Sequence, residues 1–239
     1  MNEAPGRVLP RLDESLLTHI APFTGLDRRQ VRDILDLATC RRYAPGTAIF
    51  DEGMPAERFY MLLDGYVRVV RMSATGHQVT LLYIPSGELF GIARAFRLES
   101  YPATAITAVE AIGLSWPMSL WDIFVAQYEG FARETFRIIG QRITEKNDRI
   151  VELTSQQVQQ RVANALLRLI NQTGRKVEDG IMIDFPITRR DISEMTATTL
   201  YTVSRLLSQW EKEGILESGR RQIKVREPHN LTELANPRS

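Results

Sequence analysis

The spacing of apolar residues changes twice along this chain of 239 residues. Between residues 12 and 38 apolar positions recur every three or four residues, which predicts helices in SLLTHIAPF, ending at Pro22, and in LDRRQVRDILDLA. Between residues 43 and 116 short runs of Val, Ile, Leu, Tyr and Phe alternate with glycines, which predicts strands. Helical spacing returns after residue 116. The pattern predicts an α+β protein with a β-rich middle.

The β-rich middle has a regular turn rhythm. Gly65, Gly76 and Gly87 are 11 residues apart, which is typical of a sandwich or barrel. Asp64-Gly65 inside FYMLLDGYVRVVRM predicts a hairpin, and Thr75-Gly76 predicts a second turn. A closed β-roll of about eight strands would accommodate the strands predicted between residues 43 and 116. The side chains expected inside it are Phe50, Phe59, Met61, Leu63, Val67, Leu81 and Ile84.

A long helix from about Phe131 to Thr154 carries a heptad seam, apolar at five of its six positions. The seam is formed by Phe136, Ile139, Ile143, Lys146, Ile150 and Leu153. Such a narrow stripe either packs along the helix's own β-roll or pairs with the same helix of a second copy, and the polar residues around it favour the dimer. Lys146 within the seam is expected to weaken the dimer while fixing its register.

The stretch ITRRDISEMTATTLYTVSRLLSQWEKEGIL, from Ile187 to Leu216, reads as two helices joined by a tight turn. The first helix has an apolar stripe of Ile192 and Met195, and the second has one of Val203, Leu206, Leu207 and Trp210. The outer face of the second helix then carries Thr199, Tyr201, Thr202, Ser204 and Arg205. This set of side chains suits reading base edges in a major groove, although a helical hairpin with a solvated face has the same pattern.

The neighbours of this two-helix unit favour the DNA-binding interpretation. A helix in VQQRVANALLRLINQTG precedes it, ending at Thr173-Gly174. A hairpin in ILESGRRQIKV follows it, turning at Ser218-Gly219 with Arg220 and Arg221 beside the turn. Helix, helix-turn-helix and basic hairpin form a winged helix-turn-helix, whose wing arginines suit phosphate contacts.

Charge and composition sharpen this picture modestly. Residues 1–154 hold 17 basic and 19 acidic residues, whereas residues 155–239 hold 13 and 10, so the basic excess lies in the part with the helix-turn-helix. The single cysteine, Cys40, excludes an internal disulfide. No run of about 18 apolar residues and no signal sequence is found, so a cytoplasmic location is expected. Three domains are predicted: a sensor at 1–130, a dimerisation helix at 131–154 and a DNA-binding domain at 155–239.

In this order, a β-roll, a long helix and ITRRDISEMTATTLYTVSRLLSQWEKEGIL resemble the CRP/FNR family of bacterial transcription regulators, as do FYMLLDGYVRVVR and PSGELFG. The resemblance implies a double-stranded β-roll like a cyclic-nucleotide-binding domain, a homodimer on near-palindromic DNA, and contact with RNA polymerase. It implies DNA contacts from Arg189 as well as from Thr199, Tyr201, Thr202, Ser204, Arg205, Arg220 and Arg221. It implies an effector pocket formed by Gly87, Glu88, Leu89, Tyr101 and Thr104.

Departures from the family pattern reduce the number of effectors and cofactors that this chain is expected to bind. Cyclic-nucleotide binders in the family keep an Arg-Ser/Thr pair where this chain reads Tyr101-Pro102-Ala103-Thr104, so no cation neutralises a phosphate there unless Arg94 or Arg97 substitutes. Cys40 alone cannot hold the iron–sulfur cluster of the oxygen-sensing branch, and GELFGIARAF lacks the Cys and His haem ligands of the carbon-monoxide-sensing branch.

The remaining branch responds to nitrogen oxides, and YPATAITAVE resembles it. Its members can use haem, which needs an axial ligand. His19 is the candidate ligand here, while His77 in a turn and His229 in the tail fit a solvated role better. Several Met residues and Tyr101 stay open as ligands. The cofactor is therefore undecided, with haem possible and nitric oxide as the corresponding signal.

The sequence also bears on two other function classes. Three scattered histidines do not provide a metal centre, and the chain has no P-loop, nucleophile elbow or CxxC pair, so an enzyme is not expected. A regulatory module that does not bind DNA is the second alternative, and the winged helix-turn-helix argues against it. A regulator responding to a small ligand other than cyclic AMP also stays open. Tyr201 stands where many members have Glu, so the half-site is expected to differ from the family's best-known one.

Overall fold

A computed structural model describes residues 6–10, 12–74, 76 and 78–236. The chain divides into two compact units, and the boundary falls within the long helix. The first unit is Met1–Arg71 with Leu82–Glu145, and the second is Met72–Leu81 with Lys146–Ser239. None of the helices in the described ranges is long and apolar enough to cross a lipid bilayer.

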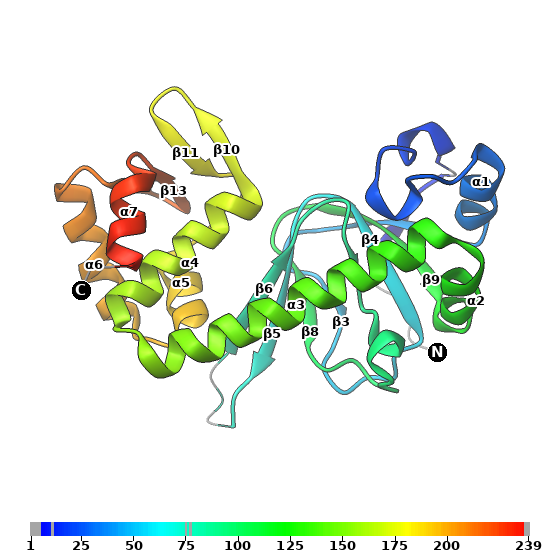
Figure 1. The fold of residues 1–239 in the computed structure, drawn as a ribbon, viewed down its shortest axis with the longest axis horizontal. Coiled ribbons are helices and arrows are strands. Elements are labelled where there is room, and N and C mark those ends of the chain that lie inside the picture. Colours follow the sequence, from blue (N-terminus) through cyan, green and yellow to red (C-terminus); the bar gives the residue numbers. More distant parts are fainter. Residues whose placement is uncertain (1–5, 11, 75, 77, 237–239) are drawn as a thin grey trace. The chain divides into compact units, whose positions relative to one another are not determined.

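Nine short strands form two antiparallel sheets in the described part of the β-roll (Figure 1). The five-stranded sheet has the order β1 (Arg7–Val8), β2 (Thr39–Tyr43), β9 (Ala111–Pro117), β4 (Arg58–Asp64) and β7 (Leu89–Phe90). The four-stranded sheet has the order β3 (Ala48–Phe50), β8 (Thr104–Thr107), β5 (Val67–Met72) and β6 (Gln78–Ile84). This confirms the predicted double-sheeted roll.

Strand β4 separates two hydrophobic cores, because successive side chains on a strand point to opposite faces. Tyr60 and Leu62 belong to a core shared with the four-stranded sheet. Phe59 and Met61 belong to the other core, in which the strand packs against helices. The helical elements on that side are η1 (Glu14–Leu16), η2 (Ala21–Phe23), α1 (Arg28–Asp36), η4 (Met118–Leu120) and α2 (Trp121–Gln127). Trp116 is fully buried there, and its Nε1 donates to the carbonyl oxygen of Ile34 at 2.8 Å.

Three local predictions in the first half of the chain were wrong. Asp64-Gly65 does not join two paired strands, since β4 and β5 lie in different sheets and the chain crosses between them there. Leu81 is 48% exposed, because the alternation of β6 turns Thr80 inward instead. Pro22 does not end a helix but lies within the short turn η2. For Asp64-Gly65 and Leu81 the local signal was sound, and the position of the strands in the sheets decided the outcome.

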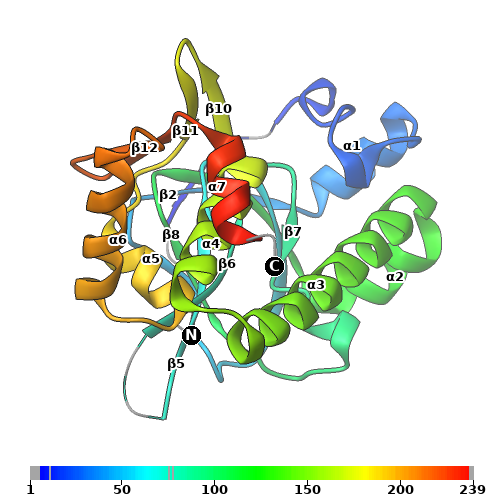
Figure 2. The same cartoon turned by 60° about the vertical axis from the view of Figure 1, so that its left-hand side comes forward.

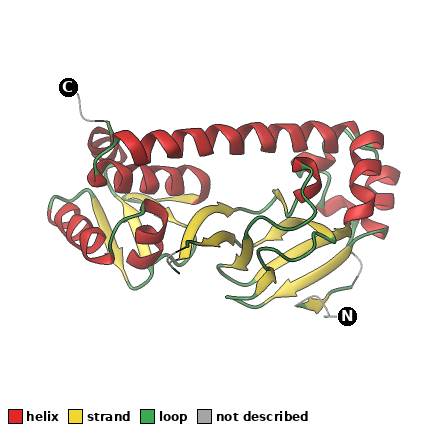
Figure 3. Ribbon diagram, turned by 90° about the horizontal axis from the view of Figure 1, so that it is seen from below, coloured by secondary structure: helices red, strands yellow, loops and turns green. Residues whose placement is uncertain are grey.

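The long helix α3 runs without interruption from Glu129 to Ser155, close to the predicted 131–154 (Figure 3). Its last turns lie in the second unit, where a buried carboxylate ties them to α4 (Val158–Thr173). Glu152 is 6% exposed and accepts hydrogen bonds from Arg168 on α4 and from Arg149 on α3. Removing one partner of such a pair leaves a buried charge uncompensated, so this contact fixes the joint between the two helices.

The second unit is a helical domain with a four-stranded sheet. The sheet has the order β10 (Gly174–Val177), β11 (Gly180–Ile183), β13 (Gln222–Val225) and β12 (Leu216–Gly219). The helices are α4, α5 (Arg189–Thr196), α6 (Leu200–Lys212) and α7 (Pro228–Ala235), and α7 packs along α4 (Figure 2). The order of helix, two-helix unit and hairpin agrees with the predicted winged helix-turn-helix.

Candidate functional site

Both helices of the helix-turn-helix begin at a threonine that caps their N-terminus, and a left-handed residue makes the turn between them. Thr188 caps α5 through a capping box with Asp191, and Thr199 caps α6. Between them Ala197 has a left-handed backbone, with φ of 48°. Glycine adopts this conformation more readily than alanine does, so the sharp turn is stabilised by the packing of both helices.

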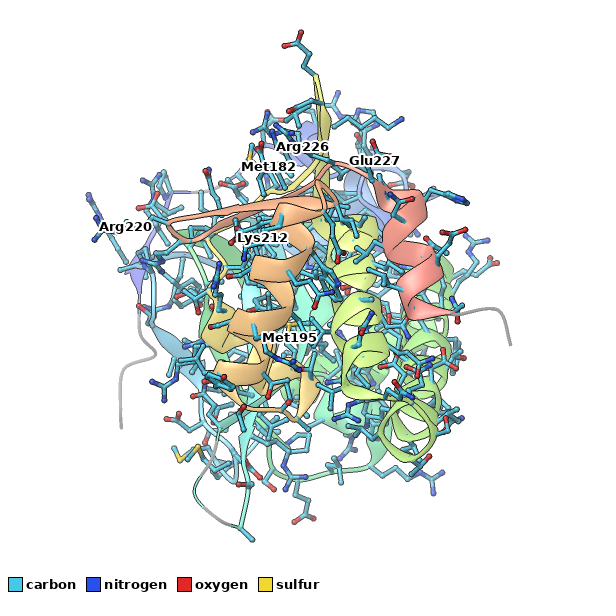
Figure 4. All side chains as sticks on the ribbon, turned by 90° about the vertical axis from the view of Figure 1, so that its left-hand side faces the viewer. Met182, Met195, Lys212, Arg220, Arg226 and Glu227 are labelled. Atoms are coloured by element: carbon cyan, nitrogen blue, oxygen red, sulfur yellow. The ribbon has the colours of Figure 1, made fainter. Side chains whose placement is uncertain are left out.

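Helix α6 buries the four side chains predicted for its inner face, Val203, Leu206, Leu207 and Trp210. The same geometry exposes Tyr201 to 77% and leaves Arg205 one turn further along on the exposed side. Within the described part of the chain, the Arg205 guanidinium has neither a hydrogen bond nor an ion pair. Gln209 continues this exposed line, a position that the i, i+4 spacing could have revealed. Figure 4 shows α6 from the side, with Met195 of α5 near its lower turns and Lys212 at its upper, C-terminal end.

Thr199 and Thr202 have less freedom than the sequence suggested. The Thr199 hydroxyl accepts a hydrogen bond from the Thr202 amide at 3.1 Å, and the two hydroxyls lie 2.9 Å apart. These groups stabilise the start of α6. The outer face of α6 beyond this cap therefore carries Tyr201, Ser204 and Arg205.

Arg189, at the start of α5, lies in a network inside the domain. Its Nη1 donates to the Ser208 hydroxyl at 3.2 Å, and its Nη2 donates to the Ser218 hydroxyl at 2.9 Å. Glu211 completes the network, 3.4 Å from Nη2 and hydrogen-bonded to the Ser218 amide at 2.9 Å. Arg189 thus connects α5, α6 and the first strand of the wing.

The wing turns at Arg220-Arg221, two residues later than predicted, because Gly219 pairs with Gln222 across the hairpin. Arg221 has a positive φ of 62°, and both arginines are exposed. Arg220 projects from the tip of the hairpin (Figure 4). Lys224, by contrast, lies 2.7 Å from Asp179 and 2.6 Å from Glu217. The two arginines at the tip are consequently the wing cations available for a phosphate.

In the first unit, the segment after β6 brings part of the predicted effector pocket against α3. Gly87 occupies a turn with φ of 87°, and its amide donates to the Leu62 carbonyl. The Leu89 carbonyl accepts a hydrogen bond from Arg142 at 2.7 Å. Burial raises the pKa of the Glu88 carboxyl, and the positive charges of Arg142 and Arg137 only partly oppose this. Arg142 could not be recognised from the sequence, because a cation beside the seam is expected to be solvated.

Tyr101 and Thr104, the other two predicted pocket residues, are used differently. Tyr101 is 4% exposed, and its ring stacks on Phe50 with 3.8 Å between centroids. Its hydroxyl donates to the Arg58 carbonyl at 2.6 Å, and burial raises its pKa. The Thr104 hydroxyl accepts from the Glu52 amide at 2.9 Å. Aromatic packing of Tyr101 on Phe50 thus fills this part of the roll.

A cavity of about 480 Å³ lies beside Gly87 and Glu88. It is lined by His19, Ile20, Ala21, Leu63, Pro85, Ser86, Gly87, Glu88, Glu134 and Arg137. His19 is exposed there, between η1 and η2, and His77 lies outside the described residues. His229 is exposed on α7, 3.5 Å from Glu233. Three charged side chains around His19 do not fit haem, which is held mainly by apolar surface, whereas they fit a small polar molecule.

The predicted seam of α3 is largely exposed on the single chain. Phe136 is 67% exposed, Ile143 51%, Ile150 60% and Leu153 43%. Lys146 is also exposed, whereas Ile139 is half-buried against the first unit's helical core. Large apolar side chains that lie in a row on the surface usually mark a site where another molecule binds.

Comparison with known protein families covers both halves of the chain. Residues 40–128 match the cyclic nucleotide-binding domain, and residues 160–234 match the Crp-like helix-turn-helix domain. The global nitrogen regulator of Synechocystis sp. is 27% identical over 226 residues, which cover 93% of this chain and 99% of that protein. The CRP-like cAMP-activated global transcriptional regulator of Mycobacterium tuberculosis is 19% identical, with the same two coverages.

Solved structures give the same result for the fold. FixK2 from Bradyrhizobium japonicum has a TM-score of 0.73 at 27% identity, covering 84% of this chain and 99% of that one. CooA from Carboxydothermus hydrogenoformans, as a mutant, has a TM-score of 0.74 at 20% identity, covering 96% and 98%. The two matched domains, their order and the relatives together show that this chain belongs to the CRP/FNR family and is a transcription regulator with a DNA-binding helix-turn-helix.

Proposed function

We propose that the chain is a homodimeric, sequence-specific DNA-binding regulator, controlled by a small molecule through its β-roll. The observation that carries this proposal is the outer face of α6, where Arg205 is exposed and unpaired within the described residues. Residues 1–130 act as the sensor, 131–154 as the dimerisation helix and 155–239 as the DNA-binding domain. RNA polymerase is the expected further partner of the DNA-bound dimer. The chain is a regulator rather than an enzyme.

DNA is read by few side chains in this proposal. Arg205 donates two hydrogen bonds to O6 and N7 of guanine, and Ser204 and Tyr201 contact the neighbouring bases. Arg220 and Arg221 bind phosphates, which sets the register of the domain without selecting a sequence. Arg189 acts mainly as a positioning residue, because its guanidinium already holds α6 and the wing together.

The dimer forms through the exposed seam of α3, from Phe136 to Leu153. A parallel pair of these helices buries the large apolar side chains that water otherwise surrounds, and it sets the two copies of α6 on neighbouring major grooves. Lys146 lowers the stability of the pair and keeps its register. The protein therefore binds a near-palindromic operator with half-sites about 10–10.5 base pairs apart, or about 34–36 Å.

The effector acts at the cavity beside Gly87 and Glu88. The charges of Glu88, Glu134 and Arg137 suit a small polar molecule, and Arg142 connects this place to α3. Cyclic AMP fits poorly, because the buried Tyr101 stands where the family's cyclic-nucleotide binders carry an arginine. An effector shifts the protein between two states only through its different affinity for them, and movement of α3 changes the spacing of the reading helices.

The test of DNA binding and dimerisation is a selection from random double-stranded DNA with the purified protein. The selected sites are expected to contain two inverted half-sites, and the protein is expected to sediment as a dimer. The Ile143→Lys variant places a charge at the centre of the seam, so it should sediment as a monomer and lose operator binding. Lys146→Ile is the matched control and should strengthen the dimer. A dimeric Ile143→Lys protein would contradict this interface.

Haem and nitric oxide form the alternative signal, supported by the resemblance of YPATAITAVE to the nitrogen-oxide-responsive branch and by His19 beside the cavity. An absorption spectrum of protein titrated with haem decides it. A Soret band that saturates at one haem per chain, shifts with nitric oxide and disappears in His19→Ala would establish haem sensing. We expect instead no stoichiometric band, since charged side chains surround His19.

A further inference from the structure

A second hollow lies in the first unit, outside the proposed effector cavity. It is a groove of about 490 Å³ between η3 (Ala93–Phe96), α2 and the first turns of α3. Its lining residues are Arg94, Ala95, Arg97, Leu98, Glu99, Trp121, Asp122, Val125, Thr135, Phe136 and Ile139. All of these belong to one compact unit of the chain.

Six of the eleven residues that line this groove are apolar. Leu98 is 42% exposed and Phe136 67% exposed, so large hydrophobic side chains meet water on both of its sides. Two of its charged groups neutralise each other, since Arg94 and Asp122 lie 3.0 Å apart. Arg97 and Glu99 contribute one charge of each sign, so the lining has no net charge. A strongly charged ligand would find no opposite net charge in this groove. An apolar side chain, by contrast, could pack against the exposed hydrophobic side chains of its lining.

The groove is continuous with the proposed dimer seam. Phe136 and Ile139 line the groove, and they are also the first two positions of the seam. Stable interfaces use roughly 20–30 residues from each partner. The seam supplies six, so a stable dimer needs more surface than the seam alone. The surface of η3 and α2 adjoins the seam at Phe136 and Ile139, so it can supply part of what is needed.

We propose that a second copy of this chain occupies the groove, so that the dimer interface extends from the α3 seam onto η3 and α2. The inserting side chain is Phe136 of the second copy, because a two-fold axis along the seam brings each Phe136 to the other copy's first helical turns. Large aromatic side chains at the centre of an interface contribute most to binding. This inference rests on the proposed homodimer and assigns it a second contact surface.

The contact has a consequence for regulation. Segment η3 follows β7 directly and lies only a few residues after Gly87 and Glu88. A change at the effector cavity therefore reaches the dimer interface through a short piece of backbone, in addition to the path along α3. In this arrangement the sensor unit itself takes part in subunit contact.

The first test compares two leucines of similar exposure in the full-length protein. Leu98→Glu places a charge in the groove, whereas Leu37→Glu places the same charge at the end of α1, where Leu37 is 49% exposed. Sedimentation equilibrium should give a dimer dissociation constant at least tenfold higher for Leu98→Glu and unchanged for Leu37→Glu. Equal constants for both variants and the wild type would overturn the proposal, even though Ile143→Lys still gave monomers.

The second test uses cross-linking and does not depend on weakening the dimer. Leu98→Cys protein is mixed with a larger, tagged Gly140→Cys protein, whose cysteine lies one helical turn from Phe136 with open space around it, and treated with a short bismaleimide. Any product of intermediate size joins two copies, and it should form with Leu98→Cys but not with Leu37→Cys. Cys40 is buried, and burial raises the pKa of its thiol, so its background reaction is slow.

Three outcomes separate the possible occupants. The mixed cross-link together with a weakened Leu98→Glu dimer supports the second copy. A native mass spectrum that shows a small molecule on the wild-type dimer, lost in Leu98→Glu without a change in dimerisation, overturns it. A wild-type protein that is monomeric at every concentration refutes the proposed homodimer itself, and with it this extension.

Discussion

Arginines in the β-roll and arginines on the DNA-reading surface differ in how their donors are used. In the roll, Arg58 donates to the Ser115 hydroxyl at 3.1 Å, to the Ser115 carbonyl at 3.0 Å and to the Thr39 hydroxyl at 3.2 Å. Arg142 likewise donates to a backbone carbonyl, and burial lowers its pKa. On α6 and at the wing tip, Arg205 and Arg220 are exposed and unpaired within the described ranges.

This difference identifies which arginines hold the fold and which are available to a ligand. A guanidinium has five donors, and those already bonded inside the protein have no remaining role in recognition. Arg189 combines the two situations, since it lies in the helix-turn-helix but its donors are bonded internally. The comparison leads to mutations with opposite effects on stability and on DNA binding.

The largest expected effect is on stability, at Arg58. Arg58→Ala removes three hydrogen bonds from a charged donor and leaves three acceptor groups of the sheet without that partner. We expect a loss of roughly 3 kcal/mol in the free energy of unfolding. Urea unfolding measures it, with Arg71→Ala as the control, because the exposed Arg71–Glu52 pair should contribute less than about 1 kcal/mol. Similar losses for both variants would contradict the distinction.

The second effect concerns Arg189 as a positioning residue. Arg189→Ala should lower the free energy of unfolding by about 2 kcal/mol, because Glu211 and two serines lose a charged partner. It should weaken binding to all DNA sequences alike, since it disturbs the wing and α6 together. Arg190→Ala, an exposed neighbour, is the control for stability. Loss of selectivity at a single base position with unchanged stability would show direct base contact instead.

The third effect is confined to recognition. Arg205→Ala should cost about 1–3 kcal/mol of operator binding and relax one base position, with stability unchanged. Arg220→Ala should lower affinity for every sequence and reduce the salt slope by about 1, as expected for a lost phosphate contact. Binding isotherms on single-base operator variants at several salt concentrations distinguish the two. A uniform loss for Arg205→Ala would refute base reading by this residue.

The smallest effect is a pH dependence at Glu88. Burial raises the pKa of its carboxyl above the ordinary 4.5, with Glu134 and Glu145 adding to the rise and Arg142 and Arg137 opposing it. The folded protein therefore keeps the proton to higher pH than the unfolded chain, so stability falls as the pH rises from 4.5 through the raised pKa. The melting temperature of Glu88→Gln relative to wild type should grow over that range. A constant difference would argue against this protonation.

The sequence predicted the helices of the DNA-binding half well because each one shows its own signals. The apolar stripes of Val203, Leu207 and Trp210 and the cap at Thr199 are local patterns that recur at fixed spacing. The same local reasoning misplaced the wing turn, since Ser218-Gly219 is a good turn sequence but the pairing of Gly219 with Gln222 moves the turn to two arginines. Turn propensity does not determine register.

In the sensor half, local sequence patterns were a poorer guide to the structure than in the DNA-binding half. Asp64-Gly65 is a good hairpin signal, but β5 pairs with β8 and β6 rather than with β4. Tyr101 was an expected pocket residue, and the structure buries its ring against Phe50. In both cases residues distant in sequence set the outcome, through strand pairing and aromatic packing that no local pattern encodes.

The sequence by itself determined the fold class, the order of β-roll, long helix and helix-turn-helix, and the buried face of α6, because these depend on periodic spacing of apolar residues. Only the tertiary structure decided which cations are free. Arg58, Arg142 and Arg189 read like any other arginine in a sequence, and their roles follow from the carbonyls, hydroxyls and carboxylates that distant segments place around them.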